Sequence, residues 1–216
     1  MDWKLLNRTF IVILLIAAGL ISVSCKGMTH SPQLWERYMA AYPHGDEKTM
    51  KWDSPPKMII DTGKKYTATI EMEKGNLVLE LYAQDAPVTV NNFVFLSLAG
   101  FYDGLAFHRV IAGFAAQAGD PSGTGLGDPG YTFANEITEH KHIAGAISMV
   151  HSSLPDSNGS QFFICYDDFP ELDGYYSVFG QLKLGWDTFV KMTPRDPSKA
   201  PSLMGDKIIR IIITEE

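Results

Sequence analysis

One arginine and one glutamine stand in an otherwise largely apolar stretch of the sequence, between Phe107 and Asp120. Gln117 follows Arg109 by eight residues, and the spacing between them is typical of short strands. A guanidinium keeps its proton at neutral pH, so Arg109 can donate hydrogen bonds but cannot serve as a general base. An ion-paired arginine at the end of a surface strand is the alternative. The context favours a guanidinium and an amide that face one apolar cleft.

A second polar side chain stands beside an aromatic residue further along the chain. Gln161 and Phe163 are two residues apart, so they lie on the same face of a strand. A polar rim around an aromatic floor is a common composition for a pocket that binds a small apolar group. Spacing alone does not bring the two segments together.

Several common catalytic motifs are absent from the sequence, including Gly-x-Ser-x-Gly, the P-loop, Cys-x-x-Cys and His-Glu-x-x-His. The glycine-rich residues 123–130 lack a following lysine, so a flexible loop is favoured over a phosphate site. His140 and His142 have no third ligand nearby and are expected in a solvated loop, so neither a metal nor a cofactor is predicted. A hydrolase using Ser160 or His108 lacks a base and an orienting acid at motif spacing. His108 is adjacent to Arg109 in a strand and is expected to face away from the cleft.

The elements that must position these residues are short. Alternating apolar residues from Tyr66 to Leu81 predict a β-hairpin that turns near Gly75. A helix is predicted from Pro87 to Gly100, and a second one over Trp186 to Met192. Six further apolar runs predict strands: Phe107–Val110, Phe114–Ala118, Ala146–Val150, Gln161–Cys165, Ser177–Gln181 and Lys207–Thr214.

These elements predict a mainly β fold. Eight strands with two helices favour a closed barrel capped at its ends, because closure leaves no exposed strand edge. The length of 216 residues, 45% of them hydrophobic, suits one globular domain with an appendage. A net charge of -7 without charge runs argues against nucleic acid as a partner. Cys165 ends an apolar run and is expected to be a small buried hydrophobe.

Residues 1–25 have the layout of a secretory signal peptide or membrane anchor. Two basic residues precede the uncharged run Phe10–Ile21, which is shorter than the roughly 20 residues of a spanning helix. The pair Ser24-Cys25 resembles the lipobox of bacterial lipoproteins, although Ser22 stands where leucine is usual. Lipidation at Cys25 is the preferred reading, with an uncleaved anchor or simple secretion as alternatives. Each predicts an exported, extracytoplasmic protein, and the first two attach it to a membrane through its N-terminus.

Residues 26–58 have no sustained periodicity. One short helix is predicted over Gln33 to Tyr42, because its apolar residues share a face and Pro43 ends it. The segment is interpreted as a tether or N-terminal extension of the domain formed by residues 59–216. Docking of its aromatic residues on that domain is the alternative.

Seven motifs together resemble the cyclophilin-type peptidyl-prolyl isomerases over residues 65–214. They are Phe107-His108-Arg109, Gly113-Phe114, Gln117, Gly119-Asp120, Asn158-Gly159-Ser160-Gln161-Phe162-Phe163-Ile164, Leu172-Asp173-Gly174 and Val178-Phe179-Gly180. The resemblance implies a closed eight-stranded antiparallel β-barrel capped by two α-helices. It also implies cis-trans isomerisation of X-Pro bonds in proline-containing polypeptides, without a cofactor or metal, by a protein expected to be a monomer.

The resemblance also implies roles for individual residues. Arg109 is expected to be catalytic. The proline pocket is expected to be lined by Phe114, Met149, Phe163 and Leu172. The peptide is expected to be positioned by Gln117 and Gln161. At the rim, His151 and Tyr176 differ from residues that many members carry, and they are expected to influence which neighbours of proline are accepted.

Two functions follow from this pattern. The first is an isomerase that acts on folding proteins outside the cytoplasm. The second is a module or chaperone that binds proline-containing segments with little turnover. The altered rim at Glu171 and Tyr176 motivates the second function, whereas retention of Arg109 and Phe163 favours the first.

Overall fold

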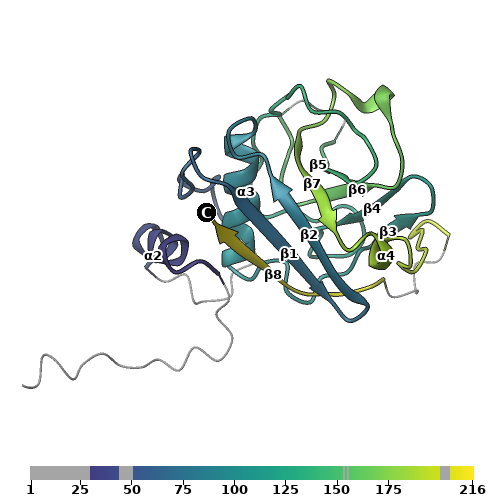
Figure 1. The fold of residues 1–216 in the computed structure, drawn as a ribbon, viewed down its shortest axis with the longest axis horizontal. Coiled ribbons are helices and arrows are strands. Elements are labelled where there is room, and N and C mark those ends of the chain that lie inside the picture. The colour runs from purple at the N-terminus through teal and green to yellow at the C-terminus, as the bar shows by residue number, and fades with distance from the viewer. Residues whose placement is uncertain (1–29, 44–50, 153, 155, 200–204) are drawn as a thin grey trace, which may run out of the picture.

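The computed structural model describes residues 30–43, 51–152, 154, 156–199 and 205–216. The predicted signal segment and Cys25 lie outside this range. The described chain forms one eight-stranded antiparallel sheet (Figure 1). Its strands are β1 (Tyr66–Met72), β2 (Gly75–Leu81), β3 (Arg109–Ile111), β4 (Ala115–Ala118), β5 (Ala146–Met149), β6 (Phe162–Cys165), β7 (Val178–Leu184) and β8 (Ile208–Glu215).

The sheet curls into a half-barrel, and the predicted closure of the barrel is not confirmed. Its strand order is β3-β4-β6-β5-β7-β2-β1-β8, so β3 and β8 are the two edges. Residues 104–107, which precede β3, hydrogen-bond to residues 206–208 at the start of β8, and Ala106 and Lys207 form an isolated bridge there. β3 has only three residues, and in the described chain no ladder joins it to β8. The mainly β, antiparallel architecture is as predicted.

Helix α3 (Pro87–Leu98) is the predicted first helix, and it begins at Pro87. The Glu136 carboxylate accepts the amides of Val88 and Thr89 at 3.0 and 2.6 Å, which satisfies two free N–H groups of the first turn. Gly100 follows the helix at φ 67°, a left-handed conformation that favours glycine. The side chains from Thr89 to Leu98 are buried, so α3 is enclosed by the rest of the fold.

Helix α4 (Trp186–Phe189) is shorter than predicted. After Val190 the amides bond three residues back, as in Met192 N–H to the Phe189 carbonyl at 3.1 Å. Such bonds tighten the last turn and end the α-helix before Met192. A 3₁₀ turn, η1 (Pro170–Leu172), lies between β6 and β7.

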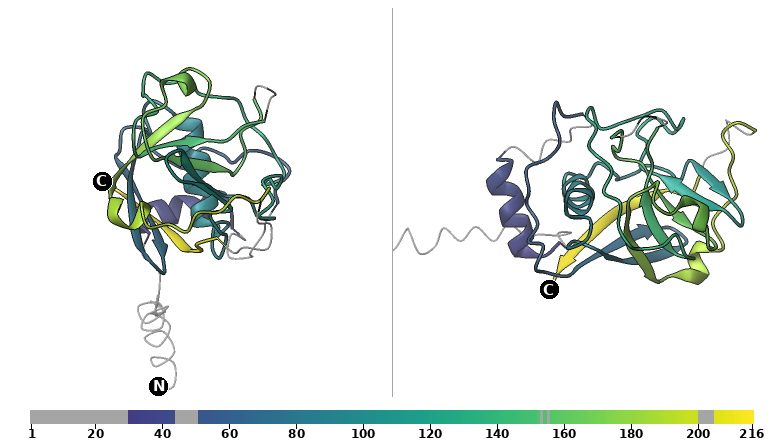
Figure 2. Two further views of the ribbon diagram at one scale, coloured as in Figure 1. Left: turned by 90° about the vertical axis from the view of Figure 1, so that its right-hand side faces the viewer. Right: turned by 90° about the horizontal axis from the view of Figure 1, so that it is seen from above.

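The described part of the N-terminal extension docks on the domain. Helix α2 (Pro32–Ala41) lies outside the sheet, near α3 and the end of β8 (Figures 1 and 2). Leu34 and Tyr38 are 0% and 2% exposed and belong to the main core. Phe95 of α3 meets the rings of Tyr42 and Trp52 at centroid distances of 4.7 and 5.1 Å. The structure therefore has the docked arrangement of the aromatic residues, while the domain boundary at residue 59 stays a prediction.

Residues His30 and Ser31 cover the outer edge of β8. The Ser31 amide donates to the Ile213 carbonyl at 3.1 Å, and the Ile213 amide donates to His30 Nδ1 at 3.0 Å. The Glu215 amide donates to the Ser31 hydroxyl at 2.8 Å. These bonds satisfy main-chain groups that an edge strand otherwise leaves open.

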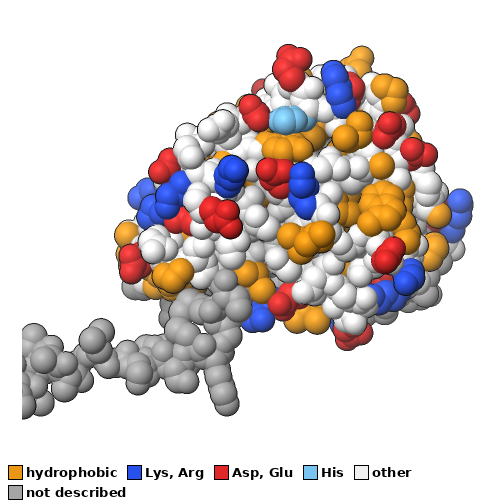
Figure 3. All heavy atoms as spheres, viewed as in Figure 1, with side chains coloured by type: hydrophobic (Ala, Val, Ile, Leu, Met, Phe, Trp, Pro, Cys, Tyr) orange, Lys and Arg blue, Asp and Glu red, His pale blue; other side chains and the backbone are white. Residues whose placement is uncertain are grey.

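The surface of the described part carries both signs of charge. Acidic and basic side chains are interspersed on the face in Figure 3. Some form exposed pairs, such as Lys183 with Glu80 at 3.1 Å. In the ranges that the structure describes, no helix is long and apolar enough to cross a membrane.

Candidate active site

The sheet register brings together the polar residues that the sequence placed apart. Arg109 of β3 pairs with Gln117 of β4, and Gln117 pairs with Phe163 of β6. Directly opposed residues in an antiparallel sheet point to the same face. The prediction that a guanidinium, an amide and an aromatic ring face one cleft is therefore confirmed.

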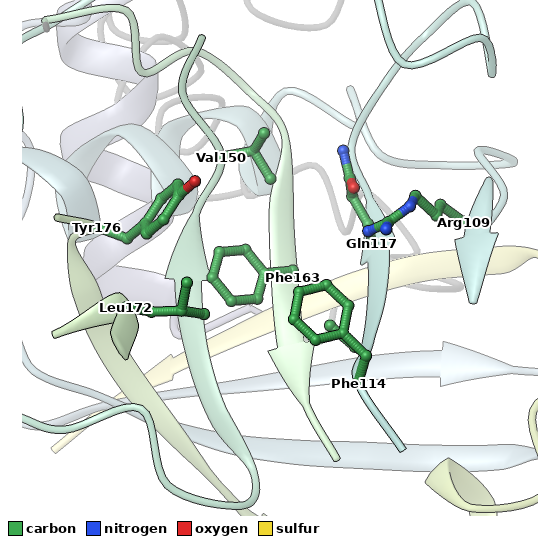
Figure 4. Close-up of a pocket in the computed structure, with 8 residues that line it drawn as sticks. Arg109, Phe114, Gln117, Val150, Phe163, Leu172 and Tyr176 are labelled. Carbon is green, nitrogen blue, oxygen red and sulfur yellow. The ribbon is translucent and has the colours of Figure 1, made fainter. Parts of the chain in front are cut away.

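These residues surround a pocket of about 390 Å³, counted with its open mouth (Figure 4). Its lining consists of Arg109, Phe114, Ala115, Gln117, Val150, Phe163, Leu172 and Tyr176. Besides Arg109, five of the predicted site residues line the pocket: Phe114, Gln117, Phe163, Leu172 and Tyr176. Ala115 and Val150 were not among the predicted site residues. The apolar and aromatic lining of the pocket suits a small ring such as a pyrrolidine.

Aromatic contacts hold the pocket walls. Phe163 is 7% exposed and meets Tyr176 edge to face, with centroids 5.6 Å apart. Phe114 meets Phe169 in the same geometry at 5.1 Å. These side chains belong to a small apolar cluster separate from the main core. The pocket is therefore built on the outer face of the β4-β6-β5 part of the sheet.

Arg109 is the cation of the pocket lining. Its guanidinium carbon lies 5.4 Å from the centroid of Phe114, close enough for a cation–π contact. In the described residues it forms no ion pair and donates no hydrogen bond. No carboxylate lines the pocket. The donors of Arg109 are therefore available to a bound ligand, and the apolar surroundings strengthen such bonds.

The amides of Gln117 and Gln161 are linked. Gln117 Nε2 donates to Gln161 Oε1 at 2.9 Å, while Gln161 Nε2 donates to the carbonyls of Gly125 and Gly127 at 3.1 and 2.9 Å. Gln161 therefore lies in a neighbouring hollow rather than in the pocket, and its amide is already engaged. Gln117 is the amide that faces the pocket.

A buried aspartate holds the loop that Gln161 contacts. Asp120 accepts hydrogen bonds from Ser122 and Gly125. Burial opposes ionisation of Asp120, but these bonds outweigh it and lower the pKa of the carboxyl. Gly119 precedes it at φ 88°, where a Cβ would lie 2.2 Å from the Ser160 carbonyl oxygen. Only glycine permits this close approach of the two strands.

The prediction that Met149 lines the pocket is wrong. Met149 of β5 pairs with Phe162, and both side chains are buried in the main core. Its neighbour Ser148 pairs with Phe163 on the pocket side. Since side chains alternate along a strand, Met149 points inward, and Val150 lines the pocket.

The prediction that His142 lies in a solvated loop is also wrong, because His142 is 1% exposed. Its Nδ1 lies 2.9 Å from Asp173 Oδ1, and its Nε2 lies 3.1 Å from Ser148 Oγ. Hydrogen bonds from His142, through its amide and its ring, lower the pKa of the Asp173 carboxyl. The set resembles a Ser-His-Asp triad, but Ser148 is fully buried and cannot reach a substrate. The ring stacks near Phe163 at 6.0 Å, behind the pocket wall.

The other histidines lie outside the pocket. His108 is buried and faces away from the cleft, as predicted, and burial lowers its pKa. His140 is partly exposed, pairs with Asp85 at 2.9 Å and stacks on Tyr82. Among the described residues, no cluster of three or more His, Cys, Asp or Glu side chains could hold a metal ion. Cys165 is a buried free cysteine, as predicted, and burial raises the pKa of its thiol to about 12.

The rim residues His151 and Tyr176 lie in contact. Their rings stack with centroids 4.4 Å apart. Tyr176 lines the pocket, whereas His151 lines the neighbouring hollow with Gln161. The two predicted rim positions therefore meet at the boundary between the two hollows.

Comparison with known proteins agrees with this geometry. The family model described as cyclophilin type peptidyl-prolyl cis-trans isomerase/CLD matches residues 67–212. A peptidyl-prolyl cis-trans isomerase of Helicobacter pylori is 52% identical over 124 residues, which are 56% of this chain and 76% of that protein. Peptidyl-prolyl cis-trans isomerase B of Bacillus subtilis is 47% identical over 137 residues, or 62% of this chain and 95% of its own.

Solved structures show the same likeness. The crystal structure of a cyclophilin-type peptidyl-prolyl cis-trans isomerase of Cryptosporidium parvum matches with a TM-score of 0.64 and 37% identity, covering 69% of this chain and 97% of that one. The same protein solved in the presence of the dipeptide Ala-Pro matches with a TM-score of 0.63. Because the family model covers more than half of the chain and the pocket has the composition that the motifs predicted, this chain belongs to the cyclophilin-type peptidyl-prolyl cis-trans isomerases and is an isomerase.

Proposed function

We propose that Arg109 is the catalytic residue of this isomerase and that it acts by electrostatic stabilisation. The observation that carries the proposal is a guanidinium at an apolar pocket with no ion pair in the described chain. Resonance makes rotation about a peptide bond cost about 18 to 20 kcal/mol. Rotation of an X-Pro bond requires relief of that resonance and no nucleophile. A donor near the twisted amide favours the state in which the nitrogen is pyramidal.

The aromatic and amide groups of the pocket supply the rest of the mechanism. Phe114, Phe163 and Leu172 hold the pyrrolidine ring, while Gln117 positions the peptide backbone. Holding the ring and one flank of the bond lets the other flank turn. Gln161 acts indirectly. Its amide oxygen accepts a hydrogen bond from Gln117 and so orients that side chain. The substrates are proline-containing polypeptides.

The substitution Arg109→Ala tests this role. We expect kcat/KM to fall by about 100-fold or more, because an aimed donor in a dry site contributes about that much. The rate is measured by NMR exchange on a proline-containing peptide, together with peptide affinity. Arg210→Ala is the matched control, since Arg210 pairs with Glu71 at the β1–β8 edge. An Arg109→Ala variant with the wild-type rate would show that the assignment is wrong.

Measurement of affinity beside turnover also separates the two candidate activities. Enzyme that binds the peptide without accelerating exchange would instead act as a binding module. The unpaired guanidinium favours turnover, because a donor at the pocket can stabilise the twisted amide.

The chain is further proposed to be exported and attached to a membrane through a lipidated Cys25, and to act as a monomer on folding proteins outside the cytoplasm. The arrangement of charged, apolar and small residues in positions 1–25 supports this. Attachment through the N-terminus is compatible with an open site, because α2 and β4 lie at opposite ends of the molecule in Figure 1. Mass spectrometry of the mature N-terminus tests the proposal. Diacylated Cys25 is the expected species, and an intact Met1 would contradict lipidation.

A further inference from the structure

The ring of His151 lies between two backbone carbonyl groups. Its Nδ1 is 2.6 Å from the Ser152 oxygen, and its Nε2 is 2.8 Å from the Tyr175 oxygen. The first contact lies within the segment that follows β5, and the second reaches the segment before β7. One side chain therefore joins two loops that are distant in sequence.

The chemistry of these contacts depends on protonation. A carbonyl oxygen can only accept a hydrogen bond, so each ring nitrogen must donate. A neutral imidazole carries one N–H and satisfies one carbonyl, whereas an imidazolium carries two and satisfies both. Only the imidazolium can therefore satisfy both carbonyl groups at once. On deprotonation, one nitrogen lone pair faces a carbonyl oxygen at hydrogen-bonding distance and repels it.

Tyr176 connects His151 to the proline pocket. The His151 ring stacks on Tyr176 at 4.4 Å with an interplanar angle of 27°, and a cationic ring strengthens that stack. Tyr176 in turn meets Phe163 and lines the pocket. His151 itself lines the neighbouring hollow. Its contacts therefore set the position of a pocket wall without touching the ring that the pocket binds.

The segments around His151 carry several titratable groups. Asp128 lines the same hollow, and Asp156 lies five residues along the loop, where it accepts the Asn135 amide at 3.3 Å. Asp173 lies in the segment that carries Tyr176 and is bound by His142. Lys141 pairs with Asp173 at 3.6 Å.

A hydrogen bond from an uncharged side chain limits the effect that deprotonation of His151 has on the loop. Asn135 Nδ2 also donates to the Tyr175 carbonyl, at 2.6 Å. Loss of the His151 bond therefore leaves the backbone of this loop attached. Loss of this bond therefore changes the position of the Tyr176 side chain and leaves the fold intact.

We propose that His151 is a protonation-dependent positioning residue: as an imidazolium it bridges the Ser152 and Tyr175 carbonyls and holds Tyr176 as a wall of the proline pocket. The proposal rests on the isomerase function of that pocket. Since the wall contacts the ring in the ground state and the transition state alike, its loosening raises KM and leaves kcat nearly unchanged.

The test measures kcat and KM for a proline-containing peptide between pH 5.5 and 8 by NMR exchange. We expect KM of the wild type to rise about threefold to tenfold across this range, the effect of one hydrogen bond. His151→Phe keeps the stacked ring without donors, and its KM is expected to be high at every pH. His151→Arg keeps donors and charge, and its KM is expected to be low at every pH.

His140→Phe is the matched control, because His140 is a partly exposed histidine that stacks on Tyr82 away from the pocket. Its pH profile should match the wild type. Nitrogen NMR of the ring gives a second readout that needs no turnover: both His151 nitrogens should carry protons at low pH.

Two results would overturn the proposal. One is a His151 ring that loses its proton in this range while KM stays constant, and the other is a His151→Phe variant with the wild-type pH profile. Absence of isomerase activity at every pH would instead contradict the proposed function, and the NMR titration would still report on the bridge.

Discussion

Two arginines lie beside aromatic side chains on opposite sides of the molecule, and they differ in whether the described chain supplies an ion-pair partner. Arg37 of α2 is neutralised, since it pairs with Glu215 and donates to the Ile59 carbonyl at 2.7 Å. Arg109 of β3 lies over Phe114 and has no such partner in the described chain. The difference shows that an arginine beside aromatic rings becomes a candidate catalytic group only where the protein leaves its donors unused.

The apolar surfaces beside these arginines differ in the same way. At α2 the protein fills the space with its own side chains, and Leu34 and Tyr38 are buried in the main core. At β4 and β6 the space between Phe114 and Phe163 stays open as a pocket (Figure 4). The first surface is therefore expected to govern stability, and the second to govern turnover. Three experiments test this separation.

Leu34→Ala should give the largest effect, and it should fall on stability alone. We expect the free energy of unfolding to fall by about 2 to 5 kcal/mol, because the change opens a cavity in the core. The measurement is urea denaturation, with kcat/KM determined on the folded enzyme. Met39→Ala, on the same helix but only partly buried, is the control and should cost less. A large loss of kcat/KM in folded Leu34→Ala would break the separation.

Phe114→Ala should act in the opposite way. The side chain is only partly buried, so its removal should change the free energy of unfolding by less than about 1 kcal/mol. It also removes the ring beneath Arg109 and one wall of the pocket, so we expect kcat/KM to fall about tenfold to thirtyfold. Peptide exchange and urea denaturation of one preparation check both quantities. A stability loss as large as that of Leu34→Ala would contradict the separation.

Lowering the pH should weaken the docked extension by a smaller amount. Burial lowers the pKa of His30 from 6.5 to about 4, and its Nδ1 must stay unprotonated to accept the Ile213 amide. Between these values the unfolded chain binds more protons than the folded one, so stability is lost as the pH falls from about 6.5 to about 4. We expect about 1 kcal/mol from this partly exposed residue.

The control for this pH effect is His30→Asn, which can still accept the amide but does not titrate. Between pH 7 and pH 4, the free energy of unfolding of the wild type should fall relative to that of His30→Asn. The isomerase pocket contains no part of this contact, so kcat should not follow the same profile. Equal pH slopes in the two proteins would show that His30 is not the responsible group.

Much of the fold was predicted from local patterns in the sequence. The hairpin from Tyr66 to Leu81 and the helix from Pro87 follow from alternation and from a proline at the first helical position, and both are present. The facing of Arg109, Gln117 and Phe163 was also anticipated from their residue types and from the strand-like spacing of the segments that carry them. The comparison with the family supplied the step that joined these segments.

The errors concern residues whose surroundings come from distant parts of the chain. His142 has the local pattern of a loop histidine, yet Asp173 and Ser148 enclose it. Met149 was assigned to the pocket by resemblance, and its register partner Phe162 places it in the core. The docking of α2 likewise depends on Phe95, more than fifty residues further along.

By itself, the amino-acid sequence determined most of the strand and helix positions, the chemical type of the site and the membership of an isomerase family, because these depend on short-range periodicity and on the identity of a few residues. The tertiary structure alone decided that the sheet curls without closing by a ladder, that the extension docks, and which arginine has a partner. Each of these is a contact between residues far apart in sequence. The geometry of such a contact depends on how the whole chain packs, so a local sequence pattern does not predict it.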